Sequence, residues 1–388
     1  MCRIKGSVKT LLFFYVLVYD KCRVLIAKEV CKTMKKYIGL EEMKNVNCSS
    51  VLGVICNCGE VSRKQITDIT GLSWGGMTKI VNKLFEHGYI EEAKCEKVSG
   101  VKRTPNIIRV CRDRHFVIGL DINRVGFGAY VMNLAGDIIK EYSSELAYHD
   151  KDELLHAIFE FIREIADDFK EKKLLAMGVA MQGILDVENG ISLRFPHCPD
   201  WKNIPIKDIL EEEFGVEVFI EHDPNCMLYS SQHEEESENM LLLRMDNSVG
   251  MAASVNGRII RGNGLLEVAH CIVVPRGKEC RCGEKGCLEA YVAPCLSKNG
   301  VNKQAVYELV EPLAIFMNNM VRIFHSDTII LTGKLAKYHE IFEKELLKKF
   351  HQFYDGEEIS VRFVEEEERA VHGATLIAVQ GAIERLRI

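Results

Sequence analysis

Two short amphipathic segments follow one another in the first quarter of the chain. In RKQITDIT (63–70) and WGGMTKIVNKLFEH (74–87), apolar residues recur every three or four positions. This spacing predicts two helices that each bury one face. Ser62 and Ser73 precede the two segments and suit helix N-caps, while Gly71 supplies a tight turn between them. Two short helices joined by such a turn predict a helix-turn-helix unit.

The polar face of the second predicted helix carries small, amide and ammonium side chains. Such side chains suit a helix that lies in the major groove of DNA, against phosphates and base edges. The residues on this face that we predict to contact DNA are Ser73, Thr78, Lys79, Asn82 and Lys83. Downstream, YIEEAKC and PNIIRVC predict two strands around a loop whose tip bears Lys102 and Arg103, which we also expect to contact DNA. The pattern therefore favours a DNA-binding winged helix-turn-helix over the same fold used only for protein contacts.

The distribution of charge along the chain also favours a DNA-binding N-terminal part. Residues 60–114 contain eleven Lys and Arg against seven Asp and Glu, whereas the whole chain of 388 residues carries a net charge of −6. A basic N-terminal part on an acidic body indicates a polyanionic partner for the first part only. The excess is modest, and the helix pattern is the stronger argument.

Residues 115–388 have a different pattern, in which short apolar strands alternate with amphipathic helices. FVIGLDI, LLAMGVAM and MLLLRM are strand-like, and the segments that begin near 152 and 373 are helical. This alternation predicts a mixed α/β body, and its repetition after residue 239 predicts two similar lobes. We expect a DNA-binding domain over 34–114 and a body over 115–388. Residues 1–33 have an apolar run too short to cross a bilayer and no cleavage site, so we expect an extension of uncertain status on a cytoplasmic protein.

Three of the fifteen cysteines lie close together in a glycine-rich stretch. Cys280, Cys282 and Cys287 follow His270 by ten to seventeen residues. Three thiolates and one imidazole are a complete ligand set for a structural zinc ion, and a disulfide is not expected in a reducing compartment. Unligated cysteines are the alternative, and Cys271 is a rival to His270.

The segment ECRCGEKGCLEAYV resembles the C-x-C-G-x-x-G-C-x-E signature of the ROK family, which groups bacterial sugar-responsive repressors with sugar kinases. The resemblance extends from about Met34 to Ile388, and the N-terminal module resembles that of the xylose-repressor and N-acetylglucosamine-repressor branch. It implies a two-lobed, actin-like and hexokinase-like (ribonuclease H-like) body. Among the metal ligands it favours His270 over Cys271, and it places a zinc loop at 270–289.

The resemblance also implies a sugar site. LLEVAH is similar to the family's G-E-x-G-H motif, and IEHDPNC is similar to its E-N-D-A-N segment, with a His in place of the first Asn. MQGILD and FPHCPDW look like two further family loops. The residues that we expect to bind a sugar are His222, Asp223, Glu267, His270 and Glu289. Zinc would then order the loop that carries several of them.

Catalysis is not expected, although Asp223 occupies the position of the general base in kinase members. Those members hold nucleotide phosphates on three glycine-rich turns, and this chain has Asp121-Ile-Asn-Arg-Val, Asp246-Asn-Ser-Val-Gly and Leu331-Thr-Gly-Lys instead. The leading hypothesis is a repressor of a carbohydrate-utilisation operon, for example for xylose. It would bind operator DNA as a homodimer or homotetramer, with a sugar or sugar phosphate in the interlobe cleft. The alternatives are a ROK sugar kinase with an accessory DNA-binding module, and a regulator that answers to a protein partner.

Overall fold

The computed structural model describes most of the chain. The described residues are 40–93, 107–123, 126–145, 148–196, 198–234, 237–261, 266–298, 300–364 and 369–388. The extension expected at 1–33 and the expected DNA contacts Lys102 and Arg103 lie outside these ranges. Among the described residues, no helix combines the length and the apolar character needed to cross a membrane.

The described part of the N-terminal module contains three helices and a small antiparallel sheet. Its elements, in chain order, are α2 (Leu40–Cys58), β1 (Glu60–Ser62), α3 (Arg63–Thr70), α4 (Trp74–Glu86), β2 (Ile90–Ala93) and β3 (Ile107–Val110). The three strands lie in the order β1-β3-β2. The sequence predicted α3, α4 and both strands of the β2–β3 pair, but not α2.

Local hydrogen bonds fix the ends of α3 and α4. Ser62 accepts the amide of Gln65, whose side chain in turn accepts the amide of Ser62, a reciprocal capping box. Ser73 caps α4 by accepting the amide of Gly76. Gly71 has a φ of 67°, so it turns the chain between the two helices in a conformation that side chains disfavour. The two predicted helices and the tight turn between them are therefore present.

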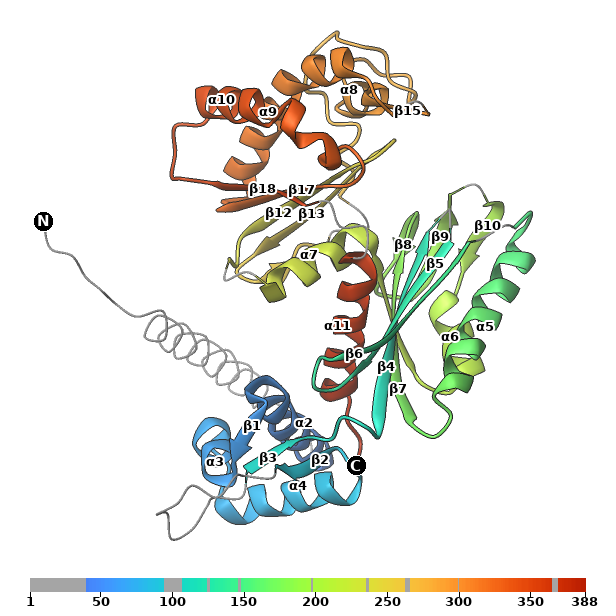
Figure 1. The fold of residues 1–388 in the computed structure, drawn as a ribbon, viewed down its shortest axis with the longest axis vertical. Coiled ribbons are helices and arrows are strands. Elements are labelled where there is room, and N and C mark those ends of the chain that lie inside the picture. The colour runs from blue at the N-terminus through green and yellow to red at the C-terminus, as the bar shows by residue number, and fades with distance from the viewer. Residues whose placement is uncertain are drawn as a thin grey trace, which may run out of the picture.

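The first lobe of the body is built on a five-stranded sheet in the order β11-β7-β4-β5-β6. Its elements are β4 (His115–Asn123), β5 (Gly126–Asn133), β6 (Ile138–Glu145), α5 (Lys151–Asp168), β7 (Lys173–Met181), β8 (Ile184–Asp186), β9 (Ile191–Phe195), β10 (Cys198–Ile204), α6 (Ile206–Phe214) and β11 (Glu217–His222). Helices α5 and α6 cover one face of this sheet, and β8–β10 form a separate small sheet (Figure 1).

The second lobe repeats the topology of the first. Its elements are β12 (Met240–Met245), β13 (Val249–Val255), β14 (Arg258–Ile259), α8 (Glu289–Val292), β15 (Leu296–Ser297), β16 (Gly300–Val301), α9 (Lys303–Phe324), β17 (Thr328–Thr332), α10 (Glu343–Phe353) and β18 (Ser360–Val364), with short 3₁₀ turns at 293–295 and 336–341. The sheet order is β14-β13-β12-β17-β18. In each lobe an antiparallel three-stranded meander is extended by two parallel strands. This duplication confirms the predicted two-lobed, actin-like body.

Two helices connect the lobes and the N-terminal module. Helix α7 (Asp223–Glu234) follows the last strand of the first lobe, and α11 (Arg369–Glu384) returns from the second lobe. Helix α11 contacts α7, the strands β4, β7 and β11, and α2 of the N-terminal module. Figure 1 shows it as a rod that runs from between the lobes down to that module.

The N-terminal module and the body share one apolar core. Val51, Ile66 and Val81 of the module pack in the same cluster as Met132 of the first lobe and Leu386, which follows α11. The Lys83 ammonium group donates to the carbonyl oxygen of Ile388 at 3.2 Å. The module is therefore fixed to the body by packing as well as by the chain.

Candidate functional site

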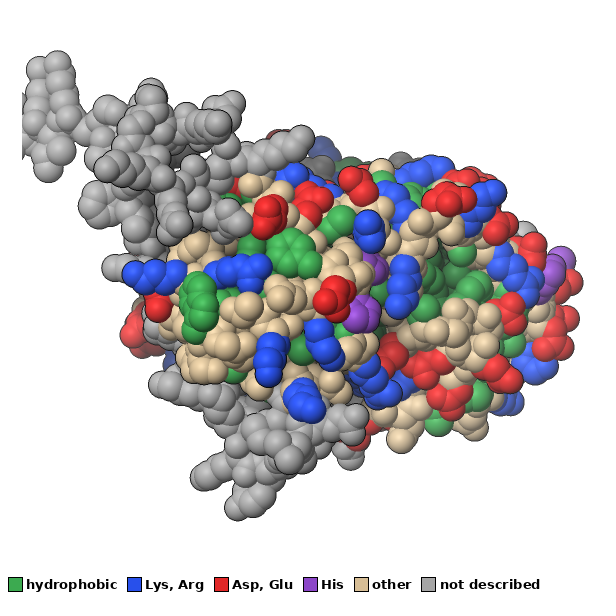
Figure 2. Space-filling view, turned by 90° about the horizontal axis from the view of Figure 1, so that it is seen from below, with side chains coloured by type: hydrophobic (Ala, Val, Ile, Leu, Met, Phe, Trp, Pro, Cys, Tyr) green, Lys and Arg blue, Asp and Glu red, His purple; other side chains and the backbone are tan. Residues whose placement is uncertain are grey.

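The outer face of α4 is exposed, as expected for a surface that reads DNA. Ser73, Lys79, Asn82 and Lys83 are all exposed. Figure 2 views this end of the molecule, where Lys and Arg side chains border a largely uncharged surface and acidic side chains are more frequent toward the first lobe. Thr78 fits its prediction least well, because it is only partly exposed and its hydroxyl oxygen is buried without a hydrogen-bond partner among the described residues.

The four predicted metal ligands converge on one point of the second lobe. The ligand atoms of His270, Cys280, Cys282 and Cys287 all lie within 4.8 Å of one another. The Cys282 and Cys287 sulfurs are 3.7 Å apart, and His270 Nδ1 is 3.6 Å from the Cys280 sulfur. Cys271 does not belong to this group. The structure thus brings together the four residues that the sequence singled out.

Backbone hydrogen bonds hold the cysteine loop in place. The amide of Cys280 donates to Glu284 O at 2.8 Å, and the amide of Gly286 donates to Lys278 O at 2.8 Å. Gly286 has a φ of 89°, and a Cβ atom there would lie 1.8 Å from the carbonyl oxygen of Val274. Only glycine fits this position, so the loop can close as tightly as the four ligands require.

The arrangement suits a metal ion better than a disulfide. Bonds of about 2.3 Å from a tetrahedral zinc to two sulfurs place those sulfurs about 3.8 Å apart, close to the separation of Cys282 and Cys287. A disulfide would need about 2.05 Å, and all three cysteines are free. The cluster can hold a metal ion of the kind that soft thiolate and imidazole ligands select.

A buried ionic cluster lies where the two lobes meet α7. Arg244 on β12 forms an ion pair with Asp223, the first residue of α7, and its Nε lies 2.8 Å from Asp246 Oδ2. Asp121 on β4 is close enough to feel the charges of Asp223 and Arg244. One guanidinium group therefore faces carboxylates from the first lobe, from α7 and from the second lobe.

Burial changes the pKa of two carboxylates in this cluster, Asp121 and Asp223. Burial and the neighbouring charge of Asp223 raise the pKa of Asp121 to about 6. Burial likewise raises the pKa of Asp223, although Arg244 opposes that shift. Asp246 also accepts the backbone amide of Lys334 at 2.7 Å through Oδ1. The Lys334 amide belongs to Leu331-Thr-Gly-Lys, the third of the segments that replace the glycine-rich turns of the kinase members. It is therefore already hydrogen-bonded to a side-chain carboxylate.

His222 lies directly before this cluster and is 1% exposed. Neither of its ring nitrogens makes a well-formed hydrogen bond within the described part of the chain. Burial lowers its pKa, although nearby carboxylates, among them Glu267, act in the opposite direction. Glu267 is thus near enough for its charge to act on His222, which directly precedes Asp223. That these residues bind a sugar stays a prediction.

Glu289 is linked to the cysteine loop. Its carboxylate lies 3.4 Å from Nη2 of Arg281, which also donates to the carbonyl oxygen of Asn247. The Glu289 amide donates to Ala269 O, next to the metal-cluster residue His270. The loop thus connects the predicted sugar-binding residue Glu289 to the metal cluster.

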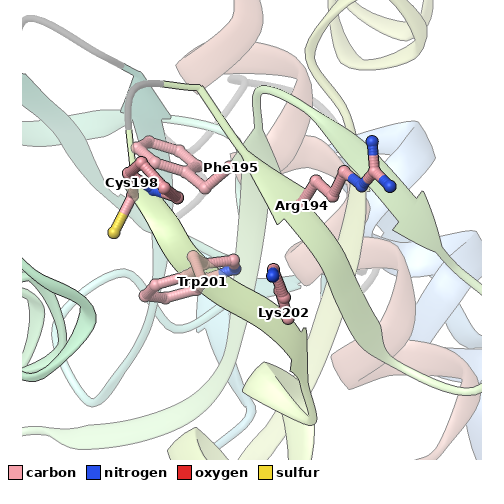
Figure 3. Close-up of a pocket in the computed structure, with 6 residues that line it drawn as sticks. Arg194, Phe195, Cys198, Trp201 and Lys202 are labelled. Atoms are coloured by element: carbon pink, nitrogen blue, oxygen red, sulfur yellow. The ribbon is translucent and has the colours of Figure 1, made fainter.

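A hollow of about 370 Å³ lies on β9 and β10 in the first lobe. Its lining residues, most of which are labelled in Figure 3, are Arg194, Phe195, Cys198, Pro199, Trp201 and Lys202. These residues belong to the segment FPHCPDW and its flanks, but none is among the five residues predicted to bind a sugar. Trp201 is buried and donates from its indole nitrogen to Ser192 Oγ at 2.8 Å.

Two charged residues of the interlobe region were missed at the sequence level. Arg244 pairs with Asp223, and Arg261, just after β14, pairs with the buried carboxylate of Glu221 at 2.5 Å. Arg244 interrupts the apolar run of β12, and a charge in a buried strand is a signal that an ionic partner exists.

Comparison with known proteins identifies the body. A family model described as the ROK family matches residues 117–296. The chain carries a ROK family domain. The xylose repressor of Caldicellulosiruptor bescii is 24% identical to the chain over 80% of the chain and 88% of the repressor. The DNA-binding transcriptional dual regulator NagC of Escherichia coli is 29% identical over 69% of the chain and 66% of the regulator.

Solved structures of ROK proteins share the fold. A ROK family transcriptional regulator, described as a homolog of the E. coli MLC protein, matches with a TM-score of 0.74 and 18% identity over 88% of this chain and 97% of its own. The ROK hexokinase from Thermus thermophilus matches with a TM-score of 0.60 and 24% identity over 68% of this chain and 97% of its own. The fold of the body is thus shared with a regulator and a kinase, and the match to the regulator extends over more of this chain.

Proposed function

We propose that the protein is a cytoplasmic, sugar-responsive repressor that binds operator DNA through a winged helix-turn-helix domain at 34–114. Its ROK body at 115–388 would bind a sugar or sugar-phosphate effector between the lobes and a structural zinc ion at the cysteine loop. The protein would act as a homodimer or homotetramer, with two recognition helices in successive major grooves. The similarity to a relative named as a xylose repressor and to one named as a DNA-binding transcriptional dual regulator supports this reading.

The exposed polar face of α4 carries the proposal. Helix α4 follows α3 across a tight turn, and the β2–β3 pair stands where a wing would. Within the described residues, Lys79 has no ion-pair partner, so its charge is available for a phosphate. These features support a DNA-binding role for the exposed face of α4, which is not packed against the body.

Helix α11 supplies a physical connection between the proposed effector site and the DNA-binding face. Near its start, His372 is hydrogen-bonded to Ser230 of α7, and α7 begins at Asp223. Near its end, Glu384 O accepts the hydroxyl of Ser49 in α2. A sugar that favours one arrangement of the lobes would thus bias the position of the module, within the limit set by its differential affinity for the two arrangements.

The ionic cluster argues against the kinase alternative. A catalytic base must be free to accept a proton from the sugar hydroxyl, and Asp223 is instead paired with Arg244. A phosphate-binding turn must offer backbone amides, and the amide of Lys334 is taken by the Asp246 carboxylate. We therefore propose that the protein binds its sugar without phosphorylating it.

A gel-shift and anisotropy titration of the full chain tests the proposal. The probe is the duplex most enriched when the protein selects from a random-sequence library. We expect specific binding that weakens steeply with salt, and we expect Lys79→Glu to abolish it while Lys344→Glu, an exposed lysine on α10, does not. If the selection enriches no sequence, the DNA-binding proposal is wrong.

The effector and the kinase alternative need separate measurements. Xylose, N-acetylglucosamine and their phosphates are added to the protein–DNA complex and, separately, to the free protein in a thermal-shift experiment. We expect one of them to raise the melting temperature and to change DNA affinity. Sustained ADP release from ATP with any of these sugars would overturn the assignment of a non-enzymatic regulator.

A further inference from the structure

A large apolar side chain stands exposed on the proposed DNA-reading helix. Trp74, the first residue of α4, is 58% exposed, whereas Trp201, the only other tryptophan of the chain, is 1% exposed. Single exposed apolar residues are common on protein surfaces. Trp74 differs from such residues in its position on the proposed DNA-reading helix and in its neighbours.

Trp74, Thr78 and Asn82 are spaced four residues apart and so lie in line along α4. Beside them, Gly75 has no heavy atom within 4 Å of where a Cβ would stand. Lys79, one turn further on, is exposed, as is Lys64 on the neighbouring helix. The indole thus projects from the start of a helix that also exposes a glycine and a lysine, so this helix offers both space and positive charge to a phosphate backbone.

We propose that Trp74 is a direct specificity contact, with its indole ring packed against the 5-methyl groups of thymines in the major groove. The inference rests on the proposed DNA-binding function and adds which chemical group of the bases the protein recognises. The thymine methyl is the apolar feature of the major groove, so it is the complement of an aromatic ring. The exposed Lys79 on the same helix favours DNA over an apolar protein surface as the partner, because an apolar surface that covered it would leave its charge unpaired.

Fluorescence quenching reports on Trp74 in the unmodified protein. Because Trp74 is exposed and Trp201 is buried, we expect acrylamide to quench the emission of Trp74 alone. We expect saturating amounts of the selected duplex to reduce quenching at least twofold. Unchanged quenching with the duplex bound would overturn the proposal.

A thermodynamic cycle with deoxyuridine then tests the methyl contact. Each thymine of the duplex is replaced in turn by uracil, which removes one methyl group. We expect one position per half-site at which this change weakens binding by about threefold to fivefold in the wild type, as for one buried methyl group. In Trp74→Ala, affinity for the thymine duplex falls by about tenfold, and uracil at that position has no further effect.

Two variants serve as controls in this cycle. Trp74→Phe keeps an aromatic ring and should retain most of the thymine preference, while Tyr307→Ala, an equally exposed aromatic on α9, should bind like the wild type. Equal affinity of Trp74→Ala and the wild type, or the same uracil penalty in both, would sink the inference. Either outcome differs from a protein that selects no DNA at all, which would sink the proposed function instead.

Discussion

The imidazole ring of His115 lies flat on the phenol ring of Tyr89, with the ring centroids 4.3 Å apart and the planes inclined by 3°. Tyr89 ends the turn after α4, and His115 begins the first strand of the body. The stacked pair therefore marks the junction between the proposed DNA-binding domain and the ROK domain. Both side chains are buried there.

This junction should weaken in acid. Burial, with the nearby charges of Lys173 and Arg114, lowers the pKa of His115 to about 4 in the folded protein, against about 6.5 in an unfolded chain. Between these values the unfolded state binds a proton that the folded state does not, so stability falls as the pH drops below about 6.5. At pH 5 the loss from this group is about 2 kcal/mol.

The measurement compares melting temperatures at pH 7.5 and pH 5. His115→Phe keeps the stacked ring and removes the titrating group, so its melting temperature should fall less on acidification than that of the wild type. The exposed His156, changed to Gln, is the matched control and should leave the pH dependence as it is. An identical acid loss in His115→Phe would contradict this role.

Removing the guanidinium group of Arg244 should destabilise the interlobe region. Arg244→Met leaves the buried carboxylate of Asp223 and the partly exposed carboxylate of Asp246 without their countercharge, and stranding the buried one costs about 3–5 kcal/mol. A second change, Asp223→Asn, removes one of those charges and should restore part of the loss. Thermal unfolding reports both effects. Arg163→Met, which breaks an exposed pair with Glu213, should change the melting temperature little.

The proposed zinc site predicts a metal content of about one ion per chain. Cys287→Ser should abolish it and lower the melting temperature, because the loop that carries Glu289 loses its anchor. Cys271→Ser changes a neighbouring thiol outside the cluster and should retain the metal. Atomic absorption after dialysis measures the content. Equal metal loss in both variants would argue against the four-residue ligand set.

The packing of α11 leaves no room for a methyl group at Gly178. A Cβ atom there would lie 1.9 Å from the carbonyl oxygen of Ala374, whereas a Cβ at Gly128 meets nothing closer than 4.0 Å. Gly178→Ala should therefore displace α11 and destabilise the protein by about 1–3 kcal/mol or more. Gly128→Ala should be tolerated. Similar melting temperatures for the two variants would show that α11 adapts freely.

Local signals explain why part of the molecule could be predicted from the sequence. The caps and spacing of α3 and α4 lie within a few residues of one another, and the mixed α/β class of the body follows from the alternation of strands and helices. The strand order within each sheet was not predicted. Helix α2 was missed because its polar and apolar residues are mixed around the helix, so its stability depends on packing against α4 and α11. The spacing of apolar residues in the sequence therefore did not indicate which face of α2 is buried.

The candidate sites also differ in how far the sequence alone could predict them. The cysteine loop was recognisable because three of its ligands lie within eight residues and the fourth is close by. The pair Arg244–Asp223 joins β12 to the start of α7 across 21 residues of sequence, and only the folded chain brings the two side chains together. Thr78 was placed on the DNA-reading face from spacing alone, and spacing does not reveal that its hydroxyl is buried.

The apolar core of the N-terminal module includes Leu386, which is 4% exposed and is made some three hundred residues after α4. During synthesis, residues 40–110 leave the ribosome long before this side chain exists. The module thus completes its core only when the body that would sense the effector has also been made. A chain interrupted before α11 would have helices of the right sequence but an open core, and would be exposed to proteolysis rather than competent to occupy DNA without its sensor.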